Sequence, residues 1–205
     1  MKKITYLFSI LIVCFLFVNC VNAASLSLSP NKGDYKLNEK FSVEILLDTE
    51  GEAVDGADVH LNYPSNILEA VKVIPGDLMS QTMMNKINSE DGSIHFSQIT
   101  DADSYFTSSG QQMLATVVFK SIKEGNAKVD FDFTAGDTRD SNVAAKGNDV
   151  LNSVKDGEYK VIKNNFIILL LIFALLVLLI IISVFVILNK KKDKKEETNQ
   201  QINQQ

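Results

Sequence analysis

The stretch MLATVVFKSIKEGNAKVDFDF, residues 113–133, decides the fold because it holds two β-strand patterns joined by a turn. Its first half is an apolar, β-branched run of the kind found in central strands. The sequence KEGN, residues 123–126, has the composition of a turn. Beyond the turn, Val129 and Phe131 alternate with charged residues, which places one set of side chains in a core and the other in solvent. The stretch therefore predicts two strands of a sheet with one buried face.

The same alternation extends outward through residues 24–161, and no long helical period interrupts it. Val59 and Leu61, for example, alternate with Asp58, His60 and Asn62. Turn-forming residues separate the apolar runs at regular intervals. Residues 78–88 contain three methionines without a clean period, and we interpret them as a loop or a short irregular strand. Seven to nine short strands of this kind predict an antiparallel β-sandwich.

Residues 166–188, FIILLLIFALLVLLIIISVFVIL, form an apolar run in which Ser183 is the only polar side chain. As a helix rising about 1.5 Å per residue, this run would be about 35 Å long, enough to cross a hydrocarbon core of about 30 Å. We therefore expect a single transmembrane helix. The lysine-rich sequence KKKDKK, residues 190–195, follows it and places the C-terminal tail in the cytoplasm.

The N-terminus predicts a secretory signal peptide. Two lysines precede an apolar stretch over residues 4–18, and Val21-Asn22-Ala23 fits a cleavage site. An uncleaved first helix and a lipid anchor on Cys20 are the alternatives. The chain is thus expected to be a single-pass protein of a bacterial cell membrane with its N-terminal domain outside. Its predicted parts are a signal peptide (1–23), a β-sandwich ectodomain (24–161), a juxtamembrane linker (162–165), a transmembrane helix (166–188) and a Lys-rich, then Gln/Asn-rich, tail (189–205).

The predicted extracellular part is acidic and lacks catalytic motifs. Residues 24–165 contain 22 Asp and Glu against 13 Lys and Arg, a net charge near −9. That charge argues against binding to nucleic acid or anionic lipid. No nucleophile motif, phosphate-binding loop or zinc-ligand spacing occurs, so we do not expect an enzyme. Both cysteines, Cys14 and Cys20, precede the predicted cleavage site, so the mature domain has no disulfide to stabilise it.

Two sets of residues raise the question of a metal ion. The only histidines, His60 and His95, would need adjacent strands and further ligands, so we interpret them as surface residues. Asp137, Asp140, Asn142 and Asp149 offer oxygen ligands but lack the compact spacing of a calcium loop. We therefore expect no cofactor and no metal on this chain.

Three segments, in this order, resemble a cohesin domain. They are VDGADVHLNYPSNILEAVKVIPGDLMS (54–80), EDGSIHFSQI (90–99) and MLATVVFKSIKEGNAKVDF (113–131). The resemblance implies a nine-stranded jelly-roll sandwich, related in fold to carbohydrate-binding modules, that grips calcium-loaded dockerin domains with one sheet face. It implies a docking module of cellulosome-type, polysaccharide-degrading assemblies, whose partner is a dockerin-bearing or other surface protein. The Ca²⁺ is then expected on the dockerin and not on this chain.

The resemblance also implies a partner-binding face. Its acidic contact positions, one on the strand before the tyrosine and one after the strand SIHFSQI, correspond to Asp58 and Asp101. The residues expected to flank them on the same side are Asp55, His60, Asn62, His95 and Asp103. The sequence departs from the family's more usual Tyr-Asp-Pro pattern at Tyr63-Pro64-Ser65, so the turn after this strand is expected to differ.

Two other functions remain open from the sequence. Related sandwiches bind polysaccharide on flat aromatic platforms, but this chain has no Trp, and its best candidate pair is Tyr105 with Phe106. The other is a structural adhesin that meets surface proteins without any dockerin, through the edge of a strand. Dockerin binding would depend on calcium, whereas adhesin contacts would tolerate loss of the Asp58 face.

Overall fold

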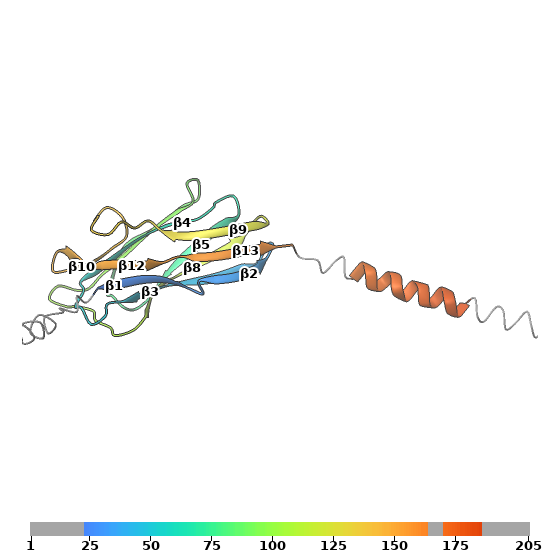
Figure 1. The fold of residues 1–205 in the computed structure, drawn as a ribbon, viewed down its shortest axis with the longest axis horizontal. Helices are drawn as coiled ribbons and strands as arrows, with labels where there is room; N and C mark the ends of the chain where they lie inside the picture. The colour runs from blue at the N-terminus through green and yellow to red at the C-terminus, as the bar shows by residue number, and fades with distance from the viewer. Residues whose placement is uncertain (1–22, 164–169, 186–205) are drawn as a thin grey trace, which may run out of the picture. The chain divides into compact units, whose positions relative to one another are not determined.

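A computed structural model describes residues 23–163 and 170–185 (Figure 1). The chain divides into two compact units, Met1–Ile162 and Lys163–Gln205. In the described residues the first unit is built of β-strands, and the second is a helix over residues 170–185. The predicted signal peptide up to Asn22, the last two linker residues and the predicted tail lie outside the described residues.

The predicted β-sandwich is confirmed, with thirteen strands in place of about nine. Several of the additional strands are short. The bounds are β1 (Ala24–Ser29), β2 (Lys32–Lys36), β3 (Lys40–Asp48), β4 (Gly56–Asn62), β5 (Leu68–Pro75), β6 (Gln81–Asn88), β7 (Ser93–Ile99), β8 (Gln112–Ser121), β9 (Gly125–Phe131), β10 (Asn142–Ala145), β11 (Asn148–Asp149), β12 (Leu151–Lys155) and β13 (Gly157–Ile162).

The strands form two sheets that pack face to face (Figure 1). The five-stranded sheet has the order β12-β1-β3-β8-β5. The eight-stranded sheet follows the path β11-β10-β4-β9-β13-β2, and β7 joins it beside β4 with β6 beyond. The expectation of a purely antiparallel sandwich is wrong at two places, because β1 pairs with β12 and β2 pairs with β13 in parallel. Both pairs join strands far apart in the sequence, an arrangement that no local turn signal encodes.

The strands that the sequence pattern missed or left open lie on segments whose composition hides a strand period. Residues 78–88, expected to be loop or irregular strand, contain β6, whose pairing with β7 is interrupted by a bulge between Thr82 and Met84. A bulge shifts the alternation by one residue, which explains the absence of a clean period. β2 falls on a segment with the composition of a turn, and its residues are exposed or half-buried. β10 lies within a polar stretch that showed no strand pattern.

The hydrophobic core lies between the two sheets. Its buried side chains come from strands along the whole sandwich, the first being Ala24 and the last Val161. Its alternation is the one that the sequence predicts, with Val129 fully buried and Phe131 nearly so. Phe119, at 0 % exposure, packs near Phe41 and Tyr63, whose ring centroids lie 5.8 Å and 5.4 Å from its own. Because all of these core residues belong to the sandwich, we expect residues 24–163 to fold on their own.

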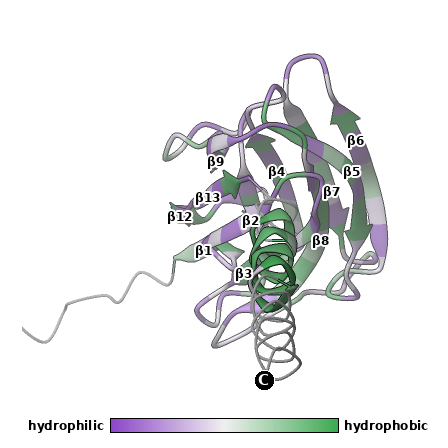
Figure 2. Cartoon of the chain, turned by 90° about the vertical axis from the view of Figure 1, so that its right-hand side faces the viewer, coloured by the Kyte–Doolittle hydropathy of each residue, from purple (hydrophilic) through white to green (hydrophobic). Residues whose placement is uncertain are grey.

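The helix over residues 170–185 lies within the apolar run expected to cross a membrane. The other residues of that run lie outside the described part. In Figure 2 the helix is predominantly hydrophobic, whereas hydrophilic and hydrophobic residues are mixed along the strands. Among the residues that the structure describes, no helix combines the length and the apolarity needed to span a bilayer.

Candidate functional site

The candidate site is built on β4 and β7, which pair antiparallel over their whole lengths. Side chains of a strand alternate between its two faces, and here Val59 and Phe96 point into the core. The neighbouring residues of both strands therefore form the outer face of the sheet. His60 lies directly opposite His95 in this pairing, and Asp58 lies opposite Ser97. The predicted outward orientation of Asp58, His60 and His95 is thus confirmed.

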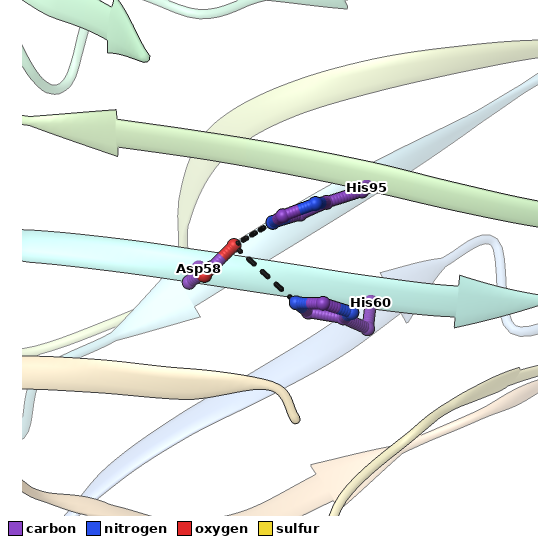
Figure 3. A group of neighbouring side chains, drawn as sticks. All are labelled: Asp58, His60 and His95. Atoms are coloured by element: carbon purple, nitrogen blue, oxygen red, sulfur yellow. Dashed lines mark hydrogen bonds and ion pairs between the residues drawn. The ribbon is translucent and has the colours of Figure 1, made fainter. Parts of the chain in front are cut away.

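Asp58, His60 and His95 converge on one point of this outer face (Figure 3). The Nε2 atom of His95 lies 2.7 Å from Oδ1 of Asp58, at hydrogen-bond distance, and the Nε2 atom of His60 lies 3.7 Å from the same oxygen. The two imidazole rings are 4.1 Å apart between centroids. The three side chains keep 29 to 34 % of their surface exposed, so a ligand can reach them from solvent.

A buried serine holds the backbone of β4 beside this cluster. On the edge of β4 away from β7, the first part pairs with β10 and the last part with β9, which leaves His60 between the two ladders. Ser141, fully buried, fills the interruption: its hydroxyl accepts a bond from the His60 N–H at 3.0 Å and donates to the His60 carbonyl at 3.1 Å. The Asp132 N–H also donates to that carbonyl at 2.9 Å. These bonds fix the strand from which His60 projects.

The other predicted acidic residues gather at the end of the sheet where β7 finishes and β4 begins. Asp55, Asp101, Asp103 and Tyr105 line one shallow hollow there, which is open to solvent. Gln81 on β6 donates a 2.9 Å hydrogen bond to Asp101. Hydrogen bonds from Gln81 and Ser80 lower the pKa of the Asp101 carboxyl, so it carries its charge over a wider range of acidity.

Two of the residues in and around the hollow have structural roles as well. Oδ2 of Asp55 accepts a 3.1 Å hydrogen bond from the Lys146 N–H, and its carbonyl accepts bonds from Thr100. These bonds tie the start of β4 to neighbouring loops. Phe106 packs against the core and bridges to Val54, so Tyr105, 54 % exposed, has no second exposed ring beside it. The Tyr105–Phe106 pair therefore does not form a flat aromatic platform.

The structure thus divides the predicted site residues into two groups. Asp58, His60 and His95 form the strand cluster, and Asn62 follows them at the far end of β4, exposed and opposite both Ser93 and Asp130. The residues that line the hollow, Asp55, Asp101, Asp103 and Tyr105, form the second group. Gly56, the first residue of β4, pairs with Ile99, the last residue of β7. The hollow, which is lined by Asp55 and Ile99, therefore begins at this end of the two strands that carry the cluster.

Sequence reasoning missed several neighbours of the cluster. Lys86 on β6 lies opposite His95 in the ladder, and Asn142 on β10 lies opposite Asp58. The strand β10 was not predicted, and for β6 a short irregular strand was only one of two alternatives, so their residues could not be assigned to this face. The sequence around Ser141 and Asn142 shows only that polar side chains are present there. It does not indicate which strand they lie beside.

The four candidate calcium ligands are used differently by the fold. Asp137 binds Arg139, whose guanidinium holds the pKa of that carboxyl at about 2. Oδ1 of Asp149 accepts bonds from the N–H groups of Val143 and Leu151. Among the described residues, Oδ1 of Asp140 and Oδ2 of Asp149 are buried without a hydrogen-bond partner.

Comparisons with known proteins relate this geometry to a family. Residues 25–165 match the family model described as the cohesin domain. No curated protein matches the sequence. Cohesin domains are non-enzymatic protein–protein docking modules, in agreement with the absence of catalytic motifs.

Solved structures show the same fold at low sequence identity. The seventh ScaB type I cohesin of Pseudobacteroides cellulosolvens is 17% identical, with a TM-score of 0.55, and the match covers 69% of this chain and 94% of that one. A type I cohesin–dockerin complex of Clostridium thermocellum matches at 15% identity and a TM-score of 0.55, covering 69% and 95%. A non-cellulosomal cohesin of the archaeon Archaeoglobus fulgidus matches at 15% sequence identity with a TM-score of 0.51. That match covers 68% of this chain and 91% of the archaeal one.

Proposed function

Because this chain belongs to the cohesin family, we propose that it docks a dockerin-type protein on the outer face of β4 and β7. The observation that carries the proposal is the position of Asp58 and Asp101. Asp58 projects from the middle of β4, and Asp101 lies two residues after the end of the paired strand β7. Both remain accessible, and their negative charges suit a partner that presents hydroxyl or cationic groups.

The surface has the features of a preformed docking site. Strands place the Asp58 cluster more rigidly than loops would, so little conformational entropy is lost on binding. The hollow with Asp101 extends the polar surface beyond the strand ends. The expected contribution of a central charged contact is about 2 kcal/mol or more, and of a peripheral one less than about 1 kcal/mol.

We also propose that the sandwich is displayed outside the cell on a membrane anchor. Support comes from the apolar run of residues 166–188, the lysines that follow it and the signal-like N-terminus. Cysteine labelling tests this topology, because the predicted mature chain has no cysteine of its own. An impermeant maleimide should label Ser109→Cys, but not Asn203→Cys, on intact cells. Labelling of both, or of neither until lysis, would refute the topology.

The docking experiment uses purified residues 24–163 to retain secreted and surface proteins of the same organism, with calcium and then with chelator. We expect a calcium-dependent protein that the Asp58→Ala and Asp101→Ala variants retain at least tenfold less well. Asp130→Ala is the matched control. Its side chain lies on β9 of the same sheet with the same 34 % exposure as Asp58, but opposite Asn62 and outside the group of three converging side chains.

The outcomes separate the competing functions. Retention of a protein that neither chelator nor Asp58→Ala affects would favour an adhesin and refute dockerin-type docking. Binding to a glycan array that Tyr105→Ala abolishes, without any retained protein, would favour polysaccharide recognition instead. Equal losses for Asp58→Ala and Asp130→Ala would show that the general negative charge of the sheet is responsible and not the proposed site.

A further inference from the structure

We propose that Asp58, His60 and His95 form a binding site for a transition-metal dication of the Zn²⁺ class. Within residues 23–163 and 170–185, these three side chains are the one group of three or more potential metal ligands whose donor atoms lie within 4.8 Å of one another. The site goes beyond docking, because its ligand is a metal ion on this chain and its formation requires no partner protein.

The spacing of the three donor atoms fits such an ion. A tetrahedral Zn²⁺ binds imidazole nitrogen and carboxylate oxygen at about 2.0–2.1 Å, which places neighbouring ligand atoms about 3.3 Å apart. The two nitrogen-to-oxygen distances here, 2.7 Å and 3.7 Å, lie on either side of that value. All three donor atoms lie within 4.8 Å of one another, so side-chain rotation can bring them to the spacing that a metal ion requires.

The fold holds these ligands near one another before any metal binds. His60 and His95 are a directly opposed pair on antiparallel strands, a relation that keeps their Cβ atoms about 5 Å apart. Asp58 is two residues before His60, so it projects from the same face of the same strand. The Ser141 hydroxyl bonds to both backbone groups of His60 and holds this part of β4 in place.

The chemistry of the donors selects the class of ion. Two imidazoles with one carboxylate suit Zn²⁺, Co²⁺, Ni²⁺ and Cu²⁺, whereas Ca²⁺ and Mg²⁺ prefer six or more oxygens. Three protein ligands leave at least one coordination position open, as in sites where zinc binds a water or another molecule. That position faces solvent, since each ligand keeps about a third of its surface exposed.

Both positive and negative charges surround the site. Lys86 lies opposite His95 on β6 and disfavours a bound cation. The net negative charge of the domain, near −9, attracts one. Ser97 and Asn142, both opposite Asp58 on adjoining strands, are uncharged. With two neutral imidazoles and one carboxylate, the site would carry a single positive charge after binding a dication.

The test titrates residues 24–163, carried on a tag without histidine, with Zn²⁺ in competition with a chromophoric chelator and separately with Co²⁺. We expect one equivalent of metal and visible Co²⁺ absorption bands typical of four or five ligands. Because the chain has only two histidines, its imidazole NMR signals are simple, and both should shift with one equivalent of Zn²⁺ and not with Ca²⁺. The full chain in detergent should give the same stoichiometry.

Matched variants identify the ligands. His60→Gln, His95→Gln and Asp58→Asn should each weaken Zn²⁺ binding at least tenfold, while Asp130→Asn should leave it unchanged. A circular dichroism spectrum shows whether each variant is folded. If the double variant His60→Gln/His95→Gln binds Zn²⁺ as tightly as the wild-type domain, or if only one imidazole responds to Zn²⁺, the proposed site is refuted. No partner is present in these titrations, so a failure of docking does not alter the result.

Discussion

Phe119 provides a quantitative test of the sandwich that presents the site. Its ring is fully buried on β8 and packs near the rings of Phe41 and Tyr63. Replacing Phe119 with Ala removes the ring and leaves a cavity, which costs about 3–5 kcal/mol. Phe119→Leu keeps most of the volume but loses two aromatic pairs of about 0.5–1.5 kcal/mol each, so we expect a loss of about 1–3 kcal/mol. The two variants should therefore rank clearly.

The assay is urea unfolding of residues 24–163 followed by circular dichroism. With a denaturant slope of about 2 kcal/mol/M, Phe119→Ala should lower the unfolding midpoint by about 2 M. Val118→Thr is the control, because its side chain is half-buried on the opposite face of the same strand, and it should change stability by no more than about 0.5 kcal/mol. A loss of stability below about 1 kcal/mol for Phe119→Ala, or equal losses of stability for Phe119→Ala and Val118→Thr, would contradict the assigned core.

Two further predictions concern the backbone and alkaline pH. Gly92 has φ near +70°, and an added Cβ would lie 2.2 Å from the Tyr63 carbonyl oxygen. Gly51 also has positive φ but has open space around it, so Gly51→Ala should cost roughly 1 kcal/mol and Gly92→Ala at least twice as much. Equal unfolding midpoints of the two variants in urea would disprove the clash at Gly92. Burial raises the pKa of the Tyr159 phenol above its usual value of 10, so the unfolded chain loses this proton first and stability falls as pH rises above about 10. Tyr159→Phe should flatten that fall relative to the wild-type domain, and an unchanged slope between pH 9 and 12 would exclude the assignment.

The sequence was sufficient for the strands that have one face in the core. In β4, β7 and β9 the alternation of apolar and polar residues is regular, and the structure places those residues as predicted. It was insufficient where a strand falls on residues of turn composition, as in β2, or is bulged, as in β6, because both hide the period in the sequence. The parallel pairs of β1 with β12 and of β2 with β13 depend on contacts between distant segments, which a local pattern does not encode.

The site residues, like the strands, were predicted where local alternation is enough and missed where tertiary contacts decide. Alternation alone placed Asp58, His60 and His95 on the outer face, but it did not give the register between β4 and β7. That register decides whether the histidines are opposed or several residues apart. For this reason the sequence favoured isolated surface histidines, whereas the structure brings both within reach of one carboxylate oxygen. The inward position of Phe106 also depends on tertiary contacts, namely its bridge to Val54.

The pairing of β13 also has a mechanical consequence. By the strand register, Ile162 lies about 13 residue steps from Asp55 along the sheet, or about 40 Å, at the opposite end of the domain. A pull between a molecule held near Asp55 and the chain beyond Ile162 would run roughly along the strands. β13 is hydrogen-bonded on both edges, to β9 and to β2, through five residue pairs each. Such a force would shear two ladders at once and would not peel off a single strand.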